Sequence, residues 1–332
     1  MKIVPYTPAR CRDWNGLVET AKNGTFLLDR NFMDYHAHRF TDCSLMAYDD
    51  GGRPAALLPA NRDDSAGTIA SHGGLTYGGL VVGRTATARQ VMDAWCGMLR
   101  WYRENTPARR LFYKPIPYIY NTYPAEEPLY ALFRSGATLK ARSLSSALPL
   151  GAPLPMRTLR VRGMKKAARG GWTVAEETEE TALREFWNIL DGVLAGRHRT
   201  HPVHTAEELL LLWRRFPANI RLFTVRKDGR MAGGCVVFHT PAVAHVQYIA
   251  ADEEGRSCGA LDLLFARLIG GTLFPGTPWL DFGISTENEG AWLNEGLIFQ
   301  KEGFGARGVC YDTYEIELQN PRLASLLNDH TL

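Results

Sequence analysis

Apolar residues recur at helical spacing in several long segments of the chain, and these segments alternate with short apolar runs that are typical of strands. Trp14, Leu17 and Val18 share one helical face and predict a helix over residues 9–21. The same spacing predicts an amphipathic helix over residues 86–104. This alternation of helices and strands favours a mixed α/β fold.

Two Asp-Gly pairs mark the clearest turns in this pattern. Asp50-Gly51 separates the apolar runs of residues 44–60, and Asp228-Gly229 separates the runs LFTV and CVVF. Glycine adopts the positive φ that a tight two-residue turn requires. We therefore predict a β-hairpin in each place.

The two halves of the chain repeat one order of predicted elements, namely helix, helix, hairpin, strand, helix and strand. In the second half the helices and strands other than the hairpin are predicted over residues 179–194, 205–216, 244–250, 259–268 and 279–283. Pro153 and Pro155 interrupt regular structure between the halves. We predict two tandem α/β (α+β) domains, residues 1–153 and 154–332, each with a mixed central sheet flanked by helices.

The charge balance narrows the classes of partner. The 332 residues carry 38 Lys and Arg against 35 Asp and Glu, a net charge of +3. This balance gives no global electrostatic signal for DNA or a membrane surface, so we expect neither. The positive charges gather in one place, at Arg157, Arg160, Arg162, Lys165, Lys166 and Arg169. That run is interpreted either as a solvated helix face or as a binding site for phosphate groups.

Several common kinds of site lack their motifs. The six cysteines form no C-x-x-C pair, and the segment RHRTHPVH has no Cys or carboxylate at ligand spacing, so no metal site is predicted. No G-x-S-x-G elbow, Walker A loop or H-E-x-x-H motif occurs. The N-terminal residues lack the apolar run of a signal peptide, and no window is long and apolar enough to span a membrane. These absences lead us to expect a cytoplasmic protein.

Two segments of the second half carry candidate chemistry. Gly255 and Gly259 lie between a predicted strand and a predicted helix, where backbone N–H groups can receive a pyrophosphate, although an ordinary turn fits equally well. The C-terminal stretch LDFGISTENEGAWLNEGLIFQKEGFGAR combines acidic residues, glycines and Lys301.

This stretch, together with the repeated order of elements, resembles the Fem family of peptidoglycan aminoacyl transferases. The family has an F-K-x-x-F-G-type motif before its last strand, and Lys301, Phe304 and Gly305 match it, whereas Gln300 replaces the aromatic residue. The resemblance implies two tandem domains of the acyl-CoA N-acyltransferase (GNAT) fold. It covers nearly the whole chain.

The resemblance implies roles for several residues. Lys301 would hold the developing oxyanion or a donor phosphate, and Gln247 and Tyr248 would lie on the strand that receives the acyl group. Glu287, or Asp281 through a water molecule, is the candidate base. The expected catalytic residues are Lys301, Tyr248 and Glu287, and the expected donor-binding residues are Gln247, Gly255, Gly259 and Phe304.

The first half supplies the expected acceptor site. Aromatic and basic residues there suit an amine-bearing, anionic acceptor such as a nucleotide-sugar peptide, in a cleft between the domains, and they suit a packed pair of strands equally well. The expected acceptor-binding residues are His72, Tyr77, Lys114, Tyr118 and, from the second half, Arg197, with Tyr120 beside them.

The resulting hypothesis is an enzyme that forms an amide on an amine acceptor, with no tightly bound cofactor and with aminoacyl-tRNA or acyl-CoA as the donor. A Fem-like role in cell-wall peptide synthesis is the first interpretation. One alternative is a GNAT N-acyltransferase that uses acyl-CoA on a small amine. Another is a tandem GNAT protein that binds a ligand without catalysis, which the reduced glycine turn permits.

Overall fold

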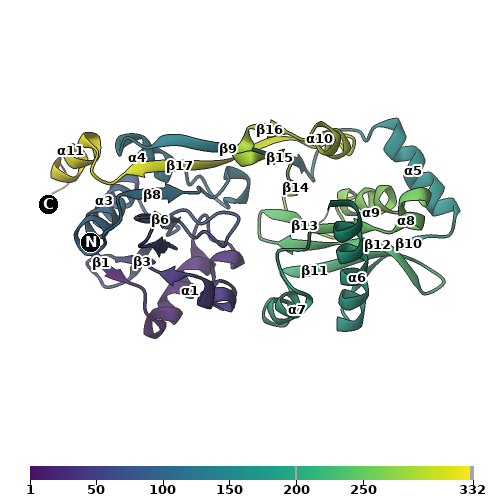
Figure 1. The fold of residues 1–332 in the computed structure, drawn as a ribbon, viewed down its shortest axis with the longest axis horizontal. Coiled ribbons are helices and arrows are strands. Elements are labelled where there is room, and N and C mark those ends of the chain that lie inside the picture. Colours follow the sequence, from purple (N-terminus) through teal and green to yellow (C-terminus); the bar gives the residue numbers. More distant parts are fainter. Residues whose placement is uncertain (199, 330–332) are drawn as a thin grey trace. The chain divides into compact units, whose positions relative to one another are not determined.

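The computed structural model describes residues 1–198 and 200–329, and its chain forms two compact units (Figure 1). The first unit consists of Met1–Ser143, Glu289–Ala291 and the residues from Cys310 onward, and the second of Leu144–Asn288 and Trp292–Val309. These units differ from the predicted division at residues 153 and 154. The chain passes between them within two long strands, β9 (Thr138–Pro149) and β17 (Arg307–Glu317), and again on either side of Glu289–Ala291. None of these crossings lies in the proline-rich segment.

The first unit places helices around two sets of strands, in the orders β1-β3-β4-β7 and β17-β8-β6-β5-β2. The predicted hairpin of residues 44–60 is confirmed, with Leu45 opposite Leu58. The strands are β1 (Lys2–Pro5), β2 (Thr41–Asp42), β3 (Leu45–Tyr48), β4 (Pro54–Leu58), β5 (Asn61–Asp63), β6 (Thr68–Ala70), β7 (Val81–Val82) and β8 (Arg110–Tyr113). The α-helices are α1 (Cys11–Thr20), α2 (Arg30–Met33), α3 (Ala88–Asn105), α4 (Glu127–Arg134) and α11 (Pro321–Asp329).

Helix α3 supplies much of the core of the first unit. It begins with a capping box in which the Thr87 side chain accepts from the Gln90 backbone N–H and the Gln90 side chain accepts from the Thr87 N–H. Trp95, Met98 and Leu99 on its apolar face are fully buried. The helical spacing of these residues predicted this face correctly.

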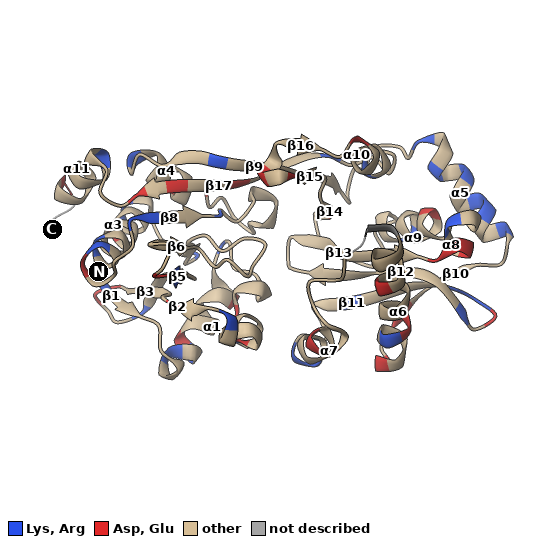
Figure 2. Ribbon diagram, viewed as in Figure 1, with Lys and Arg blue, Asp and Glu red and all other residues tan. Residues whose placement is uncertain are grey.

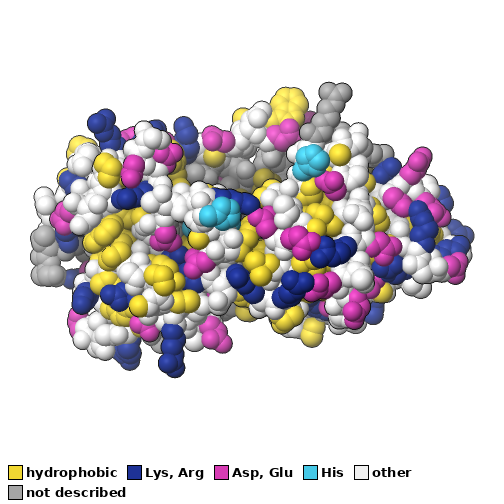
Figure 3. All heavy atoms as spheres, turned by 60° about the horizontal axis from the view of Figure 1, so that its bottom comes forward, with side chains coloured by type: hydrophobic (Ala, Val, Ile, Leu, Met, Phe, Trp, Pro, Cys, Tyr) yellow, Lys and Arg dark blue, Asp and Glu magenta, His cyan; other side chains and the backbone are white. Residues whose placement is uncertain are grey.

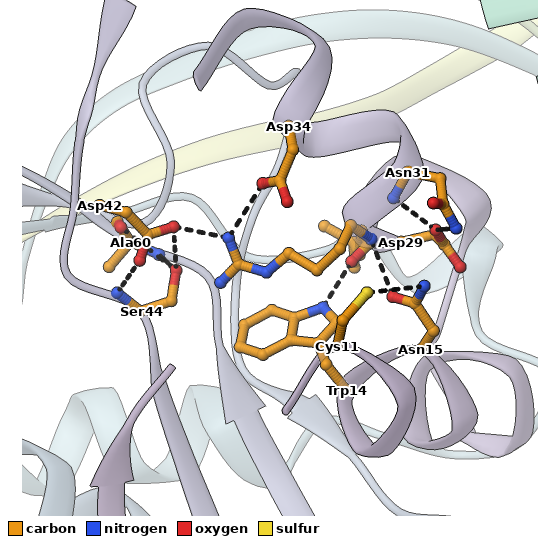
Figure 4. Close-up of polar contacts among 11 residues, drawn as sticks. Cys11, Trp14, Asn15, Asp29, Asn31, Asp34, Asp42, Ser44 and Ala60 are labelled. Atoms are coloured by element: carbon orange, nitrogen blue, oxygen red, sulfur yellow. Dashed lines mark hydrogen bonds and ion pairs between the residues drawn. The ribbon is translucent and has the colours of Figure 1, made fainter. Parts of the chain in front are cut away.

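A buried arginine joins α1, α2 and β2 in the first unit. The Arg30 guanidinium lies 3.4 Å from the centre of the Tyr6 ring and 4.1 Å from that of Trp14. Its Nη1 donates to Asp42, and Asp42 also accepts from the backbone N–H of Ser44 (Figure 4). The Arg30 side chain is 1% exposed, and among the described residues its Nε and Nη2 have no hydrogen-bond acceptor. The aromatic faces therefore provide the contact that water would otherwise make.

Replacement of Arg30 should destabilise the first unit. We expect Arg30→Lys to cost about 2 kcal/mol, because a lysine keeps the charge but cannot stack a planar fork between two rings. Thermal denaturation followed by near-ultraviolet circular dichroism measures the loss. Arg53→Lys is the matched control, since the Arg53 side chain is 84% exposed and pairs only with Asp49 among the described residues. Equal melting temperatures for the two variants would contradict the role given to the stacking.

The main sheet of the second unit is mixed and has the order β10-β11-β12-β13-β14-β9. The hairpin predicted at Asp228-Gly229 is confirmed as the β11–β12 turn. The strands are β10 (Thr173–Glu177), β11 (Ile220–Lys227), β12 (Arg230–His239), β13 (Val243–Ala251), β14 (Trp279–Ile284) and the short pair β15 (Thr286–Glu287) and β16 (Trp292–Leu293). The helices are α5 (Thr158–Arg169), α6 (Glu180–His198), α7 (Ala206–Arg215), α8 (Glu253–Cys258), α9 (Ala260–Ile269) and α10 (Glu295–Glu302).

One apolar cluster of the second unit lies on the side of the sheet that α9 covers. Phe265 of α9, Phe282 of β14 and Phe304 pack together, with ring centres 4.9 to 5.7 Å apart. Leu264 and Leu268 of α9 are fully buried in the same cluster. This core fixes α9 and the end of α10 against the sheet.

Candidate functional site

Strands β13 and β14 separate after a short parallel pairing, and this separation positions the candidate site. The two strands pair only from Val243 opposite Trp279 to His245 opposite Asp281. Beyond that point β13 carries a bulge at Gln247, where its pairing with β12 shifts by one residue. In the described part of the chain, the backbone of β13 after His245 therefore has no ladder partner on the β14 side.

Lys301 lies beside the end of β14 as a buried cation. Its ammonium donates to the backbone oxygens of Gly283 and Ile284, both at 2.7 Å, and the residue is 7% exposed. Burial lowers the pKa of Lys301 to about 8, and the nearby charge of Asp281 opposes this shift. An ammonium has three N–H groups, and the hydrogen bonds among the described residues use two of them.

Asp281 is a fully buried carboxylate that collects donors from three elements. Its Oδ1 accepts from Ser145 Oγ of β9 at 2.6 Å and from the Gly283 backbone N–H at 3.1 Å. Its Oδ2 lies 2.8 Å from Nδ1 of His245 on β13. The three contacts lock β9, β13 and β14 together next to Lys301.

A cavity of about 320 Å³ opens beside the unpaired part of β13 in the second unit. Backbone and side chains of residues 249–251 form one wall, and the α8–α9 segment forms another. Gly255 and Gly259 both line it. Gly259 has a φ of +87°, which ends α8 and lets α9 begin at once. The segment predicted as a glycine turn is thus a short helix followed by a left-handed glycine.

The first turn of α8 carries its own acidic groups. The Asp252 side chain accepts from the Gly255 N–H at 2.7 Å, and Glu253 and Glu254 follow it. Arg230 pairs with both Asp252 and Glu254. A pyrophosphate would meet negative charge here and a backbone N–H that is already bonded, which disfavours that ligand at this helix start.

The basic run of the sequence forms helix α5, whose Lys and Arg residues gather along it in Figure 2. Arg157 and Arg160 are neutralised, by Glu302 and Asp262 respectively. The other four cations are exposed and have no carboxylate partner among the described residues, namely Arg162, Lys165, Lys166 and Arg169. On the face that Figure 3 shows, Lys and Arg side chains lie among Asp and Glu side chains over much of the surface. Helix α5 is therefore a local positive surface.

Comparison with known proteins identifies the second unit. Residues 156–290 match the family model described as an acetyltransferase (GNAT) domain. The second unit holds a GNAT acyltransferase domain. In this GNAT domain β13 and β14 are the strands that separate, and the cavity lies beside them.

Three solved structures share the fold over nearly the whole chain. FemX aligns with a TM-score of 0.68 at 10% sequence identity, over 98% of this chain and 100% of FemX. L-PGS from Bacillus licheniformis aligns with a TM-score of 0.59 at 11% identity, over 98% and 95% of the two chains. A tandem GNAT protein from the clavulanic acid biosynthesis pathway gives 0.50 at 16% identity, over 96% and 99%. No curated protein matches the chain.

The predicted FemAB-like tandem GNAT fold is confirmed, and so is the prediction of an acyltransferase. In the part of the chain that the structure describes, no helix combines the length and apolar character needed to cross a membrane. Over residues 1–198 and 200–329 no group of three His, Cys, Asp or Glu side chains lies in position to hold a metal ion.

The predicted donor residues on β13 lie where the strands separate. Gln247 is half-buried at the bulge. Tyr248 is 9% exposed, and its hydroxyl lies 2.5 Å from Nδ1 of His204 and accepts from the His204 backbone N–H. Burial raises the pKa of Tyr248 to about 12, so this phenol stays protonated at neutral pH.

Two other predicted residues lie in different surroundings. Phe304 is 1% exposed within the aromatic core, so it supports α10 by packing and offers almost no surface to a donor. Glu287 is exposed on β15 and accepts from Asn294 Nδ2 at 3.0 Å. None of the described hydrogen bonds joins Glu287 to Lys301 or Asp281. Its role as the base remains a prediction.

The predicted acceptor residues of the first unit differ in exposure. Tyr118 is 53% exposed, whereas Tyr77 is 2% exposed and donates to Thr25. Lys114 donates to the Leu75 backbone oxygen, and burial lowers its pKa to about 8. His72 has a φ of +54° and is 5% exposed, and burial lowers its pKa to about 3. The side chain of Arg197 lies outside the described residues.

Sequence reasoning missed the partners of Lys301 and Asp281. Ser145 belongs to β9, a strand that the sequence analysis did not predict, and His245 was predicted only as a strand residue. A signal was present, because a lone histidine and a lone aspartate each interrupt an apolar strand, in VAHVQYIAA and WLDFGI. Two polar residues in buried parallel strands require partners, and the simplest partners are each other.

Proposed function

We propose that the chain transfers an acyl or aminoacyl group from an activated ester to an amine and so forms an amide. The observation that carries this proposal is the Lys301 ammonium, which is held by two carbonyl oxygens beside the separated strands. Its remaining N–H group can stabilise the oxyanion that forms when an amine attacks an acyl carbon. The separated backbone of β13 can orient the acyl group against that amine.

The donor that fits best is an aminoacyl ester on RNA. The four α5 cations that have no carboxylate partner among the described residues match a polyanion, whereas the acidic first turn of α8 opposes a compact pyrophosphate. In this proposal α5 binds phosphates of a charged tRNA, and the aminoacyl end reaches the cavity beside β13. The fold that the chain shares with FemX and the proposed aminoacyl-tRNA donor together suggest a nucleotide-sugar peptide of the cell wall as the acceptor.

Acyl-CoA is the second candidate donor. The match of residues 156–290 to the GNAT acetyltransferase model favours it, and so does the position of Arg256 and Gly259 on the cavity. In that case the acceptor is a small amine. A ligand-binding protein without catalysis is the third reading, and it predicts binding with no transfer.

A transfer assay with separated donors tests the proposal. Purified protein receives either charged tRNA or acetyl-CoA, together with a nucleotide-linked muropeptide or a panel of free amines, and mass spectrometry detects the product. We expect addition from charged tRNA. Transfer only from acetyl-CoA would replace the tRNA proposal by the second candidate, and binding without any product would support the third reading.

The salt dependence of tRNA binding gives a second test of the same donor, through the positive charges of α5. The triple variant Arg162→Gln, Lys165→Gln, Arg169→Gln should reduce the salt dependence of tRNA binding by about two units of log K per log salt, because three phosphate contacts are lost. Titration between 50 and 200 mM salt measures the slope. The control is Arg89→Gln, Arg53→Gln and Lys2→Gln, which removes three exposed cations of the first unit. Equal slopes for both triple variants would exclude α5 as the specific binding surface.

A further inference from the structure

His245 is held in one orientation by a buried carboxylate. Its Nδ1 lies 2.8 Å from Oδ2 of Asp281, and the two side chains are 12% and 0% exposed. Because a carboxylate only accepts hydrogen bonds, Nδ1 carries the proton. The lone pair of the neutral imidazole is therefore on Nε2.

The other ring nitrogen is free to react. Within the described residues Nε2 of His245 makes no hydrogen bond, and it is not among the buried polar atoms that lack a partner, so it retains access to solvent. Gly283 lies alongside the ring, because a Cβ placed on Gly283 would be 3.4 Å from Cε1 of His245. The same Gly283 offers its backbone oxygen to Lys301. Gly283 therefore lies next to both the His245 imidazole and the Lys301 ammonium.

Two charged side chains lie near His245, Asp281 and Lys301. Asp281 contacts the ring from β14, and Lys301 lies beyond Asp281 on α10. On the other side β12 places the apolar Phe238 opposite His245 in the ladder. Asp281 is in turn fixed by Ser145 and by the Gly283 N–H, so the carboxylate cannot turn away from the imidazole.

We propose that His245 is the proton acceptor of the transfer reaction, with Asp281 as its positioning residue. This inference rests on the proposed function. The nitrogen lone pair of the acceptor amine forms the C–N bond, and the C–O bond of the ester donor breaks. The proton of the amine passes to Nε2 of His245 and then to the leaving oxygen, so the histidine ends each cycle unchanged. Lys301 holds the oxyanion between these steps.

Chemical rescue tests this role directly. We expect His245→Ala to lower kcat by about 100-fold with little change in the KM of the donor. Added imidazole should restore much of the lost rate, because it can occupy the space of the missing ring beside solvent. His245→Gln, which fills that space, should lose a similar amount without rescue. A folded His245→Ala that keeps its rate, or that imidazole fails to rescue, overturns the proposal.

His239→Ala is the matched control. His239 lies on β12 in the same unit, is half-buried, and its Nε2 contacts Thr277 rather than a carboxylate. It should keep wild-type kcat and respond to no imidazole. A wild-type protein that transfers nothing contradicts the proposed function itself, whereas an active wild type with an active His245→Gln variant contradicts only the role of His245.

A measurement without turnover checks the positioning residue. The nitrogen chemical shifts of His245 should report the Nδ1–H form in the wild type. Asp281→Asn should abolish this preference, because an amide can donate to Nδ1 and favour the other tautomer. Unchanged shifts in Asp281→Asn would remove Asp281 from the proposal.

Discussion

Lys301→Met is expected to lower kcat by about 10²–10³-fold, the loss found when one donor to an oxyanion is removed. The ammonium is held by the Gly283 and Ile284 backbone oxygens at 2.7 Å, so its remaining N–H is preorganised. Methionine has a similar volume and cannot donate. Steady-state kinetics with the active donor measures the effect. Lys227→Met is the control, because Lys227 is exposed at the end of β11.

The proposed role of Lys301 also predicts the direction in which kcat changes with pH. Burial lowers the pKa of Lys301 to about 8, so the charged form is lost as the pH rises through about 8. If the ammonium holds the oxyanion, kcat of the wild type falls over that interval. A kcat that rises over the interval would instead assign Lys301 as a base and contradict the proposed role.

Stability separates a catalytic loss from a folding defect. The folded-state pKa of Lys301 lies below its value of 10.5 in an exposed lysine, so the folded state binds this proton less tightly than the unfolded state. Burial of the ammonium therefore destabilises the fold below pH 8, and the cost disappears as the pH rises toward 10.5. Lys301→Met should melt no lower than the wild type at pH 7, and its advantage should shrink at higher pH. A lower melting temperature at pH 7 would indicate a structural lysine.

The order of elements was predictable because each signal is local. Helical spacing placed α3 and α6, and the Asp-Gly pairs placed both hairpins. The division into units was less accessible. Strand β9 reads TLKARSLSSALP, with polar residues at its start, and its partners are distant in sequence, so nothing local marks it as a strand. Because β9 was not recognised as a strand, the proline-rich segment that follows it was predicted as the boundary.

A sequence motif points to some residues of the candidate site. Other contacts in the site depend on the register of two strands and could not be predicted. The C-terminal motif singled out Lys301, and the structure places its ammonium beside β14, while its catalytic role stays a prediction. Phe304 belongs to the same motif but packs in the core, because sequence adjacency does not tell which face of a turn meets a ligand. The contact of His245 with Asp281 depends on a parallel register of three residue pairs, which the sequence does not specify.

Gly259→Ala should destabilise the second unit by about 3 kcal/mol, which lowers its melting temperature by roughly 10 °C. Two costs combine. Gly259 has a φ of +87°, which an alanine adopts only with strain. In addition a Cβ on Gly259 would come within 2.5 Å of the Gly163 backbone oxygen on α5. Because that atom is backbone, α5 as a whole must move.

Gly229→Ala separates the two costs. Gly229 has a φ of +80° in the β11–β12 turn, and a Cβ there would meet nothing within 4 Å. It should lose only the strain, about 1 kcal/mol. Equal melting temperatures for the two variants would show that α5 yields without cost, and the contact between α5 and α9 would then have no part in stability.

The same contact links stability to the donor. Gly259 lines the cavity, and Arg160 of α5 reaches the cavity while it pairs with Asp262 of α9 at 3.0 Å. Displacement of α5 by Gly259→Ala should therefore also raise the KM of the donor, whereas Gly229→Ala should not change it. If the KM of Gly259→Ala stays at the wild-type value in protein that is folded at the assay temperature, the donor does not use the wall that α5 and α9 form together.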